Sequence, residues 1–227
     1  MHLKPLFMFP KWSNKVTLGV LIVLHVLPLY LGALVAYGFD PVTLNVGYQP
    51  TQPVPYSHAL HAGELGIDCR YCHNTVEKAG FAAIPPTETC MNCHKGIRAT
   101  SDKLKVVRES YLSGQPIPWV KVNDLPDYVY FNHAAHVNAA VSCVECHGNV
   151  NHMEVVSQEK PLNMAWCVQC HRSPESRIRP RDQVTNLDWK PAVKEDQSVE
   201  QAKYELGKAL KDKYHVNPSV DCVTCHR

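Results

Sequence analysis

Apolar positions form one long uninterrupted run near the start of the chain and few periodic stretches elsewhere. Residues 16–39 hold 24 consecutive positions without an Asp, Glu, Lys or Arg. A membrane-spanning helix needs about 20 apolar residues, whereas the apolar part of a secretory signal has about 7–15 and precedes a small-residue cleavage site. No clean Ala-x-Ala follows this run. The pattern predicts a retained single-pass anchor, and a cleaved signal is the alternative.

The charges beside this run predict its orientation. Segment 1–15 carries Lys4, Lys11 and Lys15 and no acidic residue. Because basic residues stay on the cytoplasmic side of a membrane, we expect the chain after the run to lie on the periplasmic side of the cytoplasmic membrane. His25 stands within the run, and an ionisable residue there is either functional or packed neutral against a partner helix. We favour the packed role.

Two further stretches have recognisable patterns. Residues 40–57 cover most of the proline-spaced segment GYQPTQPVPYSH (47–58), which predicts a semi-rigid strap. A contact surface for another subunit is an equal alternative. Residues 198–214 predict an exposed helix, with Ser198 as its cap, Gln201 at the capping-box position and Pro218 preventing its continuation. We expect this helix to be scaffold or a docking face.

All ten cysteines fall in five Cys-x-x-Cys-His motifs, CRYCH, CMNCH, CVECH, CVQCH and CVTCH. This is the signature of c-type haem attachment. Zinc sites need four ligands and commonly pair two Cys-x-x-Cys knuckles, which five motifs cannot do evenly. Neither zinc nor disulfides require a histidine after every second cysteine. We therefore predict five c-type haems, at a first (69–73), second (90–94), third (143–147), fourth (167–171) and fifth (222–226) site.

Each motif supplies its own covalent and proximal groups. The predicted attachment residues are Cys69, Cys72, Cys90, Cys93, Cys143, Cys146, Cys167, Cys170, Cys222 and Cys225. The predicted proximal iron ligands are His73, His94, His147, His171 and His226. With 17 prolines and 11 glycines, the chain predicts a mostly α and irregular fold with little regular secondary structure, short helices at each motif and haems as its core.

An internal duplication predicts the distal ligands. YSHALH precedes the first and second sites, and FNHAAH precedes the third and fourth, with offsets of 74–77 residues between equivalent positions. A fixed period indicates a repeated unit. Because one histidine reaches one iron, each pair should serve two neighbouring haems. The predicted distal ligands are His58, His61, His133 and His136.

The distal ligand of the remaining iron is open on this pattern. Met164 ranks first, and Met153, His215 and His152 follow. A Met/His pair would raise the reduction potential of its haem relative to a His/His pair. Methionines in such positions are often packing residues.

Charge excludes one class of partner. The chain has 23 basic and 21 acidic residues. Without the three amino-terminal lysines, 20 basic residues face 21 acidic ones in the exported part. No basic patch supports nucleic-acid binding.

Several phrases resemble a known family. GYQPTQPVPYSHALHAGELGIDCRYCH, IPPTETCMNCH, SCVECHGNVNHMEVV and PLNMAWCVQCHR look like the pentahaem cytochrome c subunit of bacterial alternative complex III, a quinol oxidoreductase. The histidine-pair units also resemble class III multihaem cytochromes, whose upstream histidines are distal ligands. The resemblance covers residues from about 15 to 181 and the last motif, and it supports Met153 and Met164 as candidates.

The resemblance implies an electron-transfer subunit without catalysis of its own. Its implied partners are integral membrane quinol-oxidising subunits and an iron–sulfur subunit, with a monohaem cytochrome c, a copper protein or a terminal oxidase as acceptor. One alternative is a membrane quinol dehydrogenase of the NapC/NrfH type, whose first haem sits directly behind its membrane span. The other is a multihaem reductase, which needs an open iron position.

The sequence divides into six predicted segments. They are the cytoplasmic terminus 1–15, the span 16–39, the strap 40–57, a first dihaem unit with its connector 58–130, a second dihaem unit 131–181, and a carboxyl-terminal segment 182–227 with a helix and the fifth site.

Overall fold

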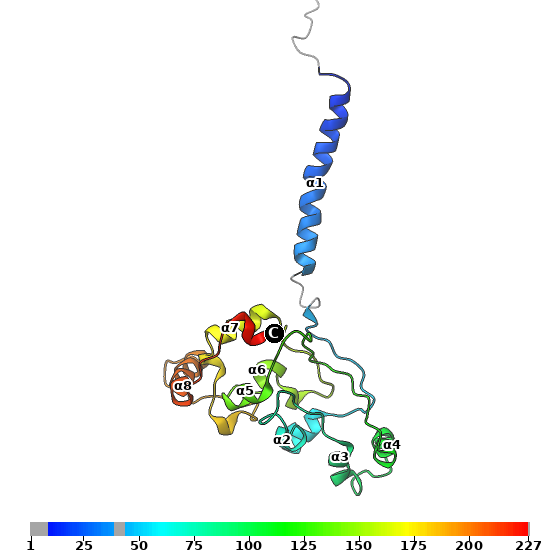
Figure 1. Cartoon of the computed structure of the whole chain (residues 1–227), viewed down its shortest axis with the longest axis vertical. Helices are drawn as coiled ribbons and strands as arrows, with labels where there is room; N and C mark the ends of the chain where they lie inside the picture. Colours follow the sequence, from blue (N-terminus) through cyan, green and yellow to red (C-terminus); the bar gives the residue numbers. More distant parts are fainter. Residues whose placement is uncertain (1–8, 39–43, 227) are drawn as a thin grey trace, which may run out of the picture. The chain divides into compact units, whose positions relative to one another are not determined.

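The computed structural model describes residues 9–38 and 44–226 (Figure 1). These residues belong to two separate units, which precede and follow residues 39–43 in the sequence. The first unit is helix α1, Trp12–Gly38. The helix begins four residues before the predicted span. Phe39, the last residue of that span, and Lys4, one of the three lysines before it, lie outside the described residues. It is the one described helix with the length and apolar composition to cross a membrane. Within it, Nδ1 of His25 lies 2.7 Å from the carbonyl oxygen of Leu21.

The second unit consists of short helices joined by irregular chain (Figure 1). Its described part contains an isolated β-bridge, Val141 to Ile178, and no strand. The elements are η2 (Ala59–Glu64), α2 (Cys69–Cys72), α3 (Thr87–His94), η3 (Asp102–Leu104), α4 (Lys105–Ser113), α5 (His133–Asn138), α6 (Val144–His147), η4 (Val150–His152), α7 (Met164–Arg172), η5 (Glu175–Arg177), η6 (Arg181–Gln183), α8 (Val199–Tyr214) and α9 (Cys222–Cys225). The mostly helical and irregular fold predicted from the sequence is confirmed.

The side chains of the second unit bury two small apolar clusters. One gathers Val54, Met91, Val107 and Ile117, and the other gathers Ala140, Ile178, Val184 and Leu210. Clusters of this size are small for a chain that could bury a conventional core. They fit a fold in which cofactors supply much of the apolar interior.

The predicted strap is bonded to the domain along its described part. The backbone amide of Gly47 donates to the carbonyl of Gln158 at 2.7 Å, and the amide of Gln158 donates to the carbonyl of Tyr48 at 3.0 Å. The Gln52 side chain bonds the backbone of Val120 in both directions. This stretch therefore packs on the domain.

Helix α8 confirms the predicted helix and its capping box. The Ser198 hydroxyl accepts from the amide of Gln201 at 3.2 Å, and the Gln201 side chain accepts from the amide of Ser198 at 3.0 Å. The helix ends at His215, whose φ of 55° is left-handed. The prediction of an exposed helix was wrong for one face: Gly207 is buried there, because α8 packs closely on η5.

Candidate haem-binding site

Each Cys-x-x-Cys-His motif lies on a short helix, namely α2, α3, α6, α7 and α9 in chain order. A single helical turn brings the two cysteines of a motif to the same side. The first turn is capped by Asp68, whose Oδ1 accepts from the amide of Arg70 at 2.8 Å. The fourth is capped by Asn163, whose Oδ1 accepts from the amide of Trp166 at 2.9 Å.

Four of the five predicted proximal histidines are oriented by the backbone. Nδ1 of His73 lies 2.8 Å from the carbonyl of Ala83, and Nδ1 of His171 lies 2.6 Å from the carbonyl of Ser219. Nδ1 of His94 lies 2.9 Å from the carbonyl of Ile97, and Nδ1 of His226 lies 3.2 Å from the carbonyl of Tyr128. A carbonyl only accepts, so Nδ1 carries the proton and Nε2 keeps its lone pair. Metal-ligating histidines are held in this way.

The predicted distal histidines of three sites show the same arrangement. Nδ1 of His61, His133 and His136 lies 2.8, 3.0 and 2.8 Å from a backbone carbonyl. The bonds of His61 and His136 go to the carbonyls four residues earlier, of Ser57 and Asn132. The duplicated units thus repeat this bond as well as their sequence.

Three pairs of imidazole rings face each other across a gap of suitable size. The ring centres are 6.2 Å apart for His61 and His94, 6.5 Å apart for His133 and His147, and 6.0 Å apart for His136 and His171. Imidazole nitrogens bind first-row metals at about 2.0–2.1 Å, and the ring centre lies about 1 Å further away, so two imidazoles on opposite sides of one iron have centres about 6.2 Å apart. These residues fit haem iron.

His58 is the remaining member of the first histidine pair. Its Nδ1 is buried without a hydrogen-bond partner. Burial lowers its pKa to about 4, with His73 as the next cause. Burial also lowers the pKa of His147 to about 4, and His133 contributes. Neutral imidazole is the form that binds a metal, so both rings are suited to ligation.

The attachment sites are neighbours in a definite order. The Asn92 amide of the second site donates to the Tyr71 hydroxyl of the first at 3.0 Å. Cys69 of the first site lies close enough to Cys143 of the third to raise the pKa of that thiol. Helix α5 connects the third and fourth sites, because its two histidine rings lie beside His147 and His171. Nδ1 of His171 lies 2.6 Å from the carbonyl of Ser219, which shortly precedes the fifth motif. The resulting series is second, first, third, fourth, fifth.

The four candidates for the remaining distal ligand have different surroundings. Nε2 of His152 lies 2.9 Å from Oδ1 of Asp188. His215 ends helix α8. The Met153 sulfur accepts from the Ser157 hydroxyl at 4.0 Å. Met164 is 69 % exposed at the start of α7.

Met164 begins the helix that carries the fourth site. It shares a helix face with Cys167, because residues three apart are neighbours on a helix. Burial raises the pKa of the Cys167 thiol, and Cys225 of the fifth site contributes. His152 is the poorest candidate, since its Nε2 is already engaged.

Sequence reasoning missed a charged cluster at the third site. Glu145, within the motif, accepts from Arg177 at 2.7 Å and from Arg179 at 3.2 Å. The Arg179 side chain is 5 % exposed, lies over the Trp189 ring and donates to the carbonyl of Asn186 at 3.1 Å. Neither the motif spacing nor the repeat marks these arginines.

Comparison with known proteins places the chain among multihaem cytochromes. No family model matches it. It is 30 % identical over 169 residues to the multihaem cytochrome c subunit of menaquinone reductase from Nitratidesulfovibrio vulgaris (strain Hildenborough), an alignment covering 63 % of this chain and 80 % of the relative. The predicted class of fold and the presence of several c-type haems are thereby confirmed. The chain therefore belongs to the family of the multihaem cytochrome c subunit of menaquinone reductase.

Proposed function

We propose that this chain is a membrane-anchored pentahaem cytochrome c that carries electrons from quinol oxidation to a periplasmic acceptor, within a complex of the alternative complex III type. The observation that carries the proposal is that the five attachment sites are neighbours in one series. Sites in one series suit transfer along the chain. The quinone-linked name of the relative supports the class of reaction.

The residues of the chain have defined roles in this proposal. Ten cysteines would hold the cofactors, and five motif histidines would bind their irons from the proximal side. His58, His61, His133 and His136 would bind the first, second, third and fourth sites from the distal side, and Met164 the fifth. Bound c-type haems supply reversible one-electron chemistry. The protein contributes orientation through the Nδ1–carbonyl bonds, and it would offer two histidines to each of four irons.

The amino-terminal helix supplies the anchor in this proposal. Trp12–Gly38 has the length and composition of a membrane span. With the lysines before it on the cytoplasmic side, the second unit lies on the periplasmic side of the cytoplasmic membrane. We propose quinone-reactive membrane subunits and an iron–sulfur subunit as partners there, and a monohaem cytochrome c, a copper protein or an oxidase as acceptor.

The opposite direction of transfer is the second candidate. The relative is part of a menaquinone reductase, and a chain of this family can carry electrons toward a quinone as well as away from it. Nothing in the ligand arrangement favours one direction, because His/His ligation is common to both. The direction depends on the haem potentials relative to the quinone.

The test uses the solubilised complex and the α-band of its c-type haems. A short-chain quinol is added anaerobically to the oxidised complex, and a c-type cytochrome is then supplied as acceptor. The proposal expects rapid reduction of the band followed by reoxidation. A band that stays oxidised with quinol, but becomes reduced by a low-potential cytochrome with transfer to added quinone, would establish the second candidate. A band inert in both directions would refute both.

A further inference from the structure

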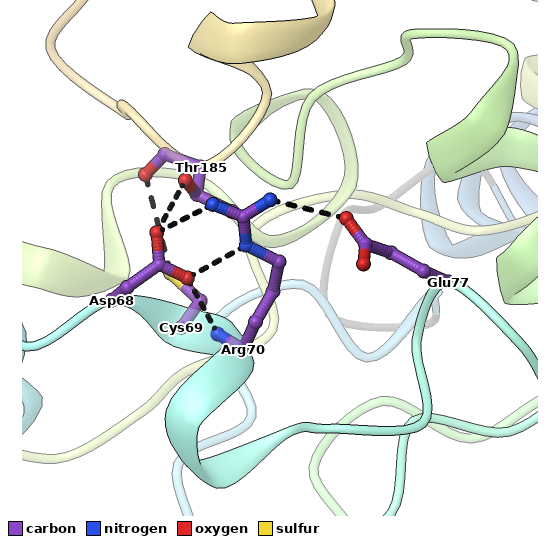
Figure 2. A network of polar contacts seen from close by, with 5 residues as sticks. All are labelled: Asp68, Cys69, Arg70, Glu77 and Thr185. Atoms are coloured by element: carbon purple, nitrogen blue, oxygen red, sulfur yellow. Dashed lines mark hydrogen bonds and ion pairs between the residues drawn. The ribbon is translucent and has the colours of Figure 1, made fainter.

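Segment 184–188, which no sequence motif marked, contacts both the first and the second dihaem unit. It lies within the stretch 182–220 that shares none of the resemblance found elsewhere. In the described part of the chain it contacts the residues just before the first and third sites. Figure 2 shows Thr185 beside Asp68, Cys69 and Arg70, with Glu77 on the far side of the Arg70 guanidinium.

On the side of the third site, the contact is made by Ser142. This residue directly precedes Cys143 and is 2 % exposed. Its hydroxyl donates to the carbonyl of Val184 at 2.6 Å. A buried, short hydrogen bond to a backbone carbonyl fixes the segment relative to the motif, since breaking it leaves buried polar groups unpaired.

On the side of the first site, the contact is made by Thr185. Its hydroxyl donates to Oδ2 of Asp68 at 3.0 Å, and its carbonyl lies 4.0 Å from the sulfur of Cys69. Asp68 also caps the helix that carries the first site. Adjacent residues of one short segment thus hold the starts of two motifs that are 74 residues apart in sequence.

A further bond joins the two dihaem units near this point. The Asn138 amide, from the second dihaem unit, donates to the carbonyl of Glu77 in the first dihaem unit at 3.0 Å. Within the first dihaem unit, the Arg70 guanidinium bonds both Asp68 and Glu77. The joint between the two units therefore lies at the first and third sites, and segment 184–188 closes it.

We propose that segment 184–188 is a clasp that holds the first and third haem sites together as one coupled pair at the centre of the series, with Thr185 and Ser142 as its positioning residues. This inference rests on the proposed haem binding and goes beyond it. A change on either side of the clasp alters the relative position of both sites. Its effect must then appear at both sites and spare the other three.

The experiment measures the five haem components of the full-length, haem-loaded protein by EPR and potentiometric titration. The variants His58→Met and His133→Met first identify the components of the first and third sites, because a Met/His pair raises the potential of its haem. Thr185→Val and Ser142→Ala are then compared with the double variant. Thr185→Ser retains the hydroxyl, and Thr51→Val changes an exposed threonine of the strap.

The clasp predicts that each single variant shifts the first and third components together, and that the double variant shifts them by less than the sum. Thr185→Ser and Thr51→Val should give the wild-type pattern. A variant that instead loses haem should lose it from these two sites together. Shifts confined to one site, additive shifts, or no shift would overturn the clasp. If His58→Met and His133→Met move no component, the proposed ligation fails instead.

Discussion

Replacing His136 by alanine should open one iron to carbon monoxide. In the structure the His136 ring faces that of His171 with 6.0 Å between ring centres, and its Nδ1 is held by the carbonyl of Asn132. Only Nε2 faces the gap. Removing this side chain would leave the fourth iron with one protein ligand on its axis. Carbon monoxide binds ferrous haem at an open position, as the reduced variant would then provide.

The size of the effect follows from the number of sites. With five motifs in the chain, the reduced wild type should show almost no carbon monoxide difference spectrum. The His136→Ala variant should show one equivalent per chain, about one fifth of the total haem given one iron per motif. Total haem by pyridine haemochrome should stay at five, because the attachment cysteines are untouched.

His152→Ala is the matched control. This histidine is also close to an attachment motif, but its Nε2 is engaged by Asp188 at 2.9 Å. Its loss should give no carbon monoxide binding and a change in unfolding free energy of about 0–1 kcal/mol, the range of exposed ion pairs. A second variant, His136→Met, should restore a sixth ligand, remain closed to carbon monoxide and raise one haem potential.

Two results would refute this reasoning. If His136→Ala leaves the spectrum unchanged, His136 is not a ligand and the ring pairing has another cause. If His152→Ala opens an iron, the bond to Asp188 does not describe the loaded protein. A full equivalent of carbon monoxide bound by the wild type would instead favour the multihaem reductase.

Three further predictions concern the scaffold. Gly207→Ala should destabilise the fold by about 1–3 kcal/mol in urea unfolding, although alanine is the better helix former, because a Cβ there would overlap the carbonyl of Glu175; a rise in stability would contradict this packing. Ser198→Ala should cost about 0.5–2 kcal/mol, since it removes the capping box, and an unchanged urea midpoint would argue against it. Hydrogen bonds from Arg70 lower the pKa of Asp68 to about 2, so the ionised carboxylate stabilises the fold fully above about pH 4 and this stabilisation is lost as pH falls through 2. The difference in unfolding free energy between wild type and Asp68→Asn, measured by denaturant unfolding, should therefore narrow between pH 4 and 2. A difference that stays constant with pH would refute this role of Asp68.

The covalent haem sites could be read from the sequence because they are local. Two thiols and a histidine must come from one turn of chain, so their spacing is fixed and five repeats of it stand out. The apolar amino-terminal helix and helix α8 are local as well, since an apolar run and a capping box depend on neighbouring residues. The histidine pairs were found through the repeat, and their ligation stays a prediction.

The partners across each gap could be decided only by the tertiary structure. Nothing in the spacing of His133 shows that its ring faces His147 rather than His171, or that the first site adjoins the third. The same holds for Thr185, which reaches Asp68 from more than a hundred residues away. Such contacts depend on how loops close in space, and loop closure leaves no periodic trace in the sequence. The chain therefore encodes its cofactor chemistry in local motifs, whereas the order and coupling of the sites depend on long-range packing.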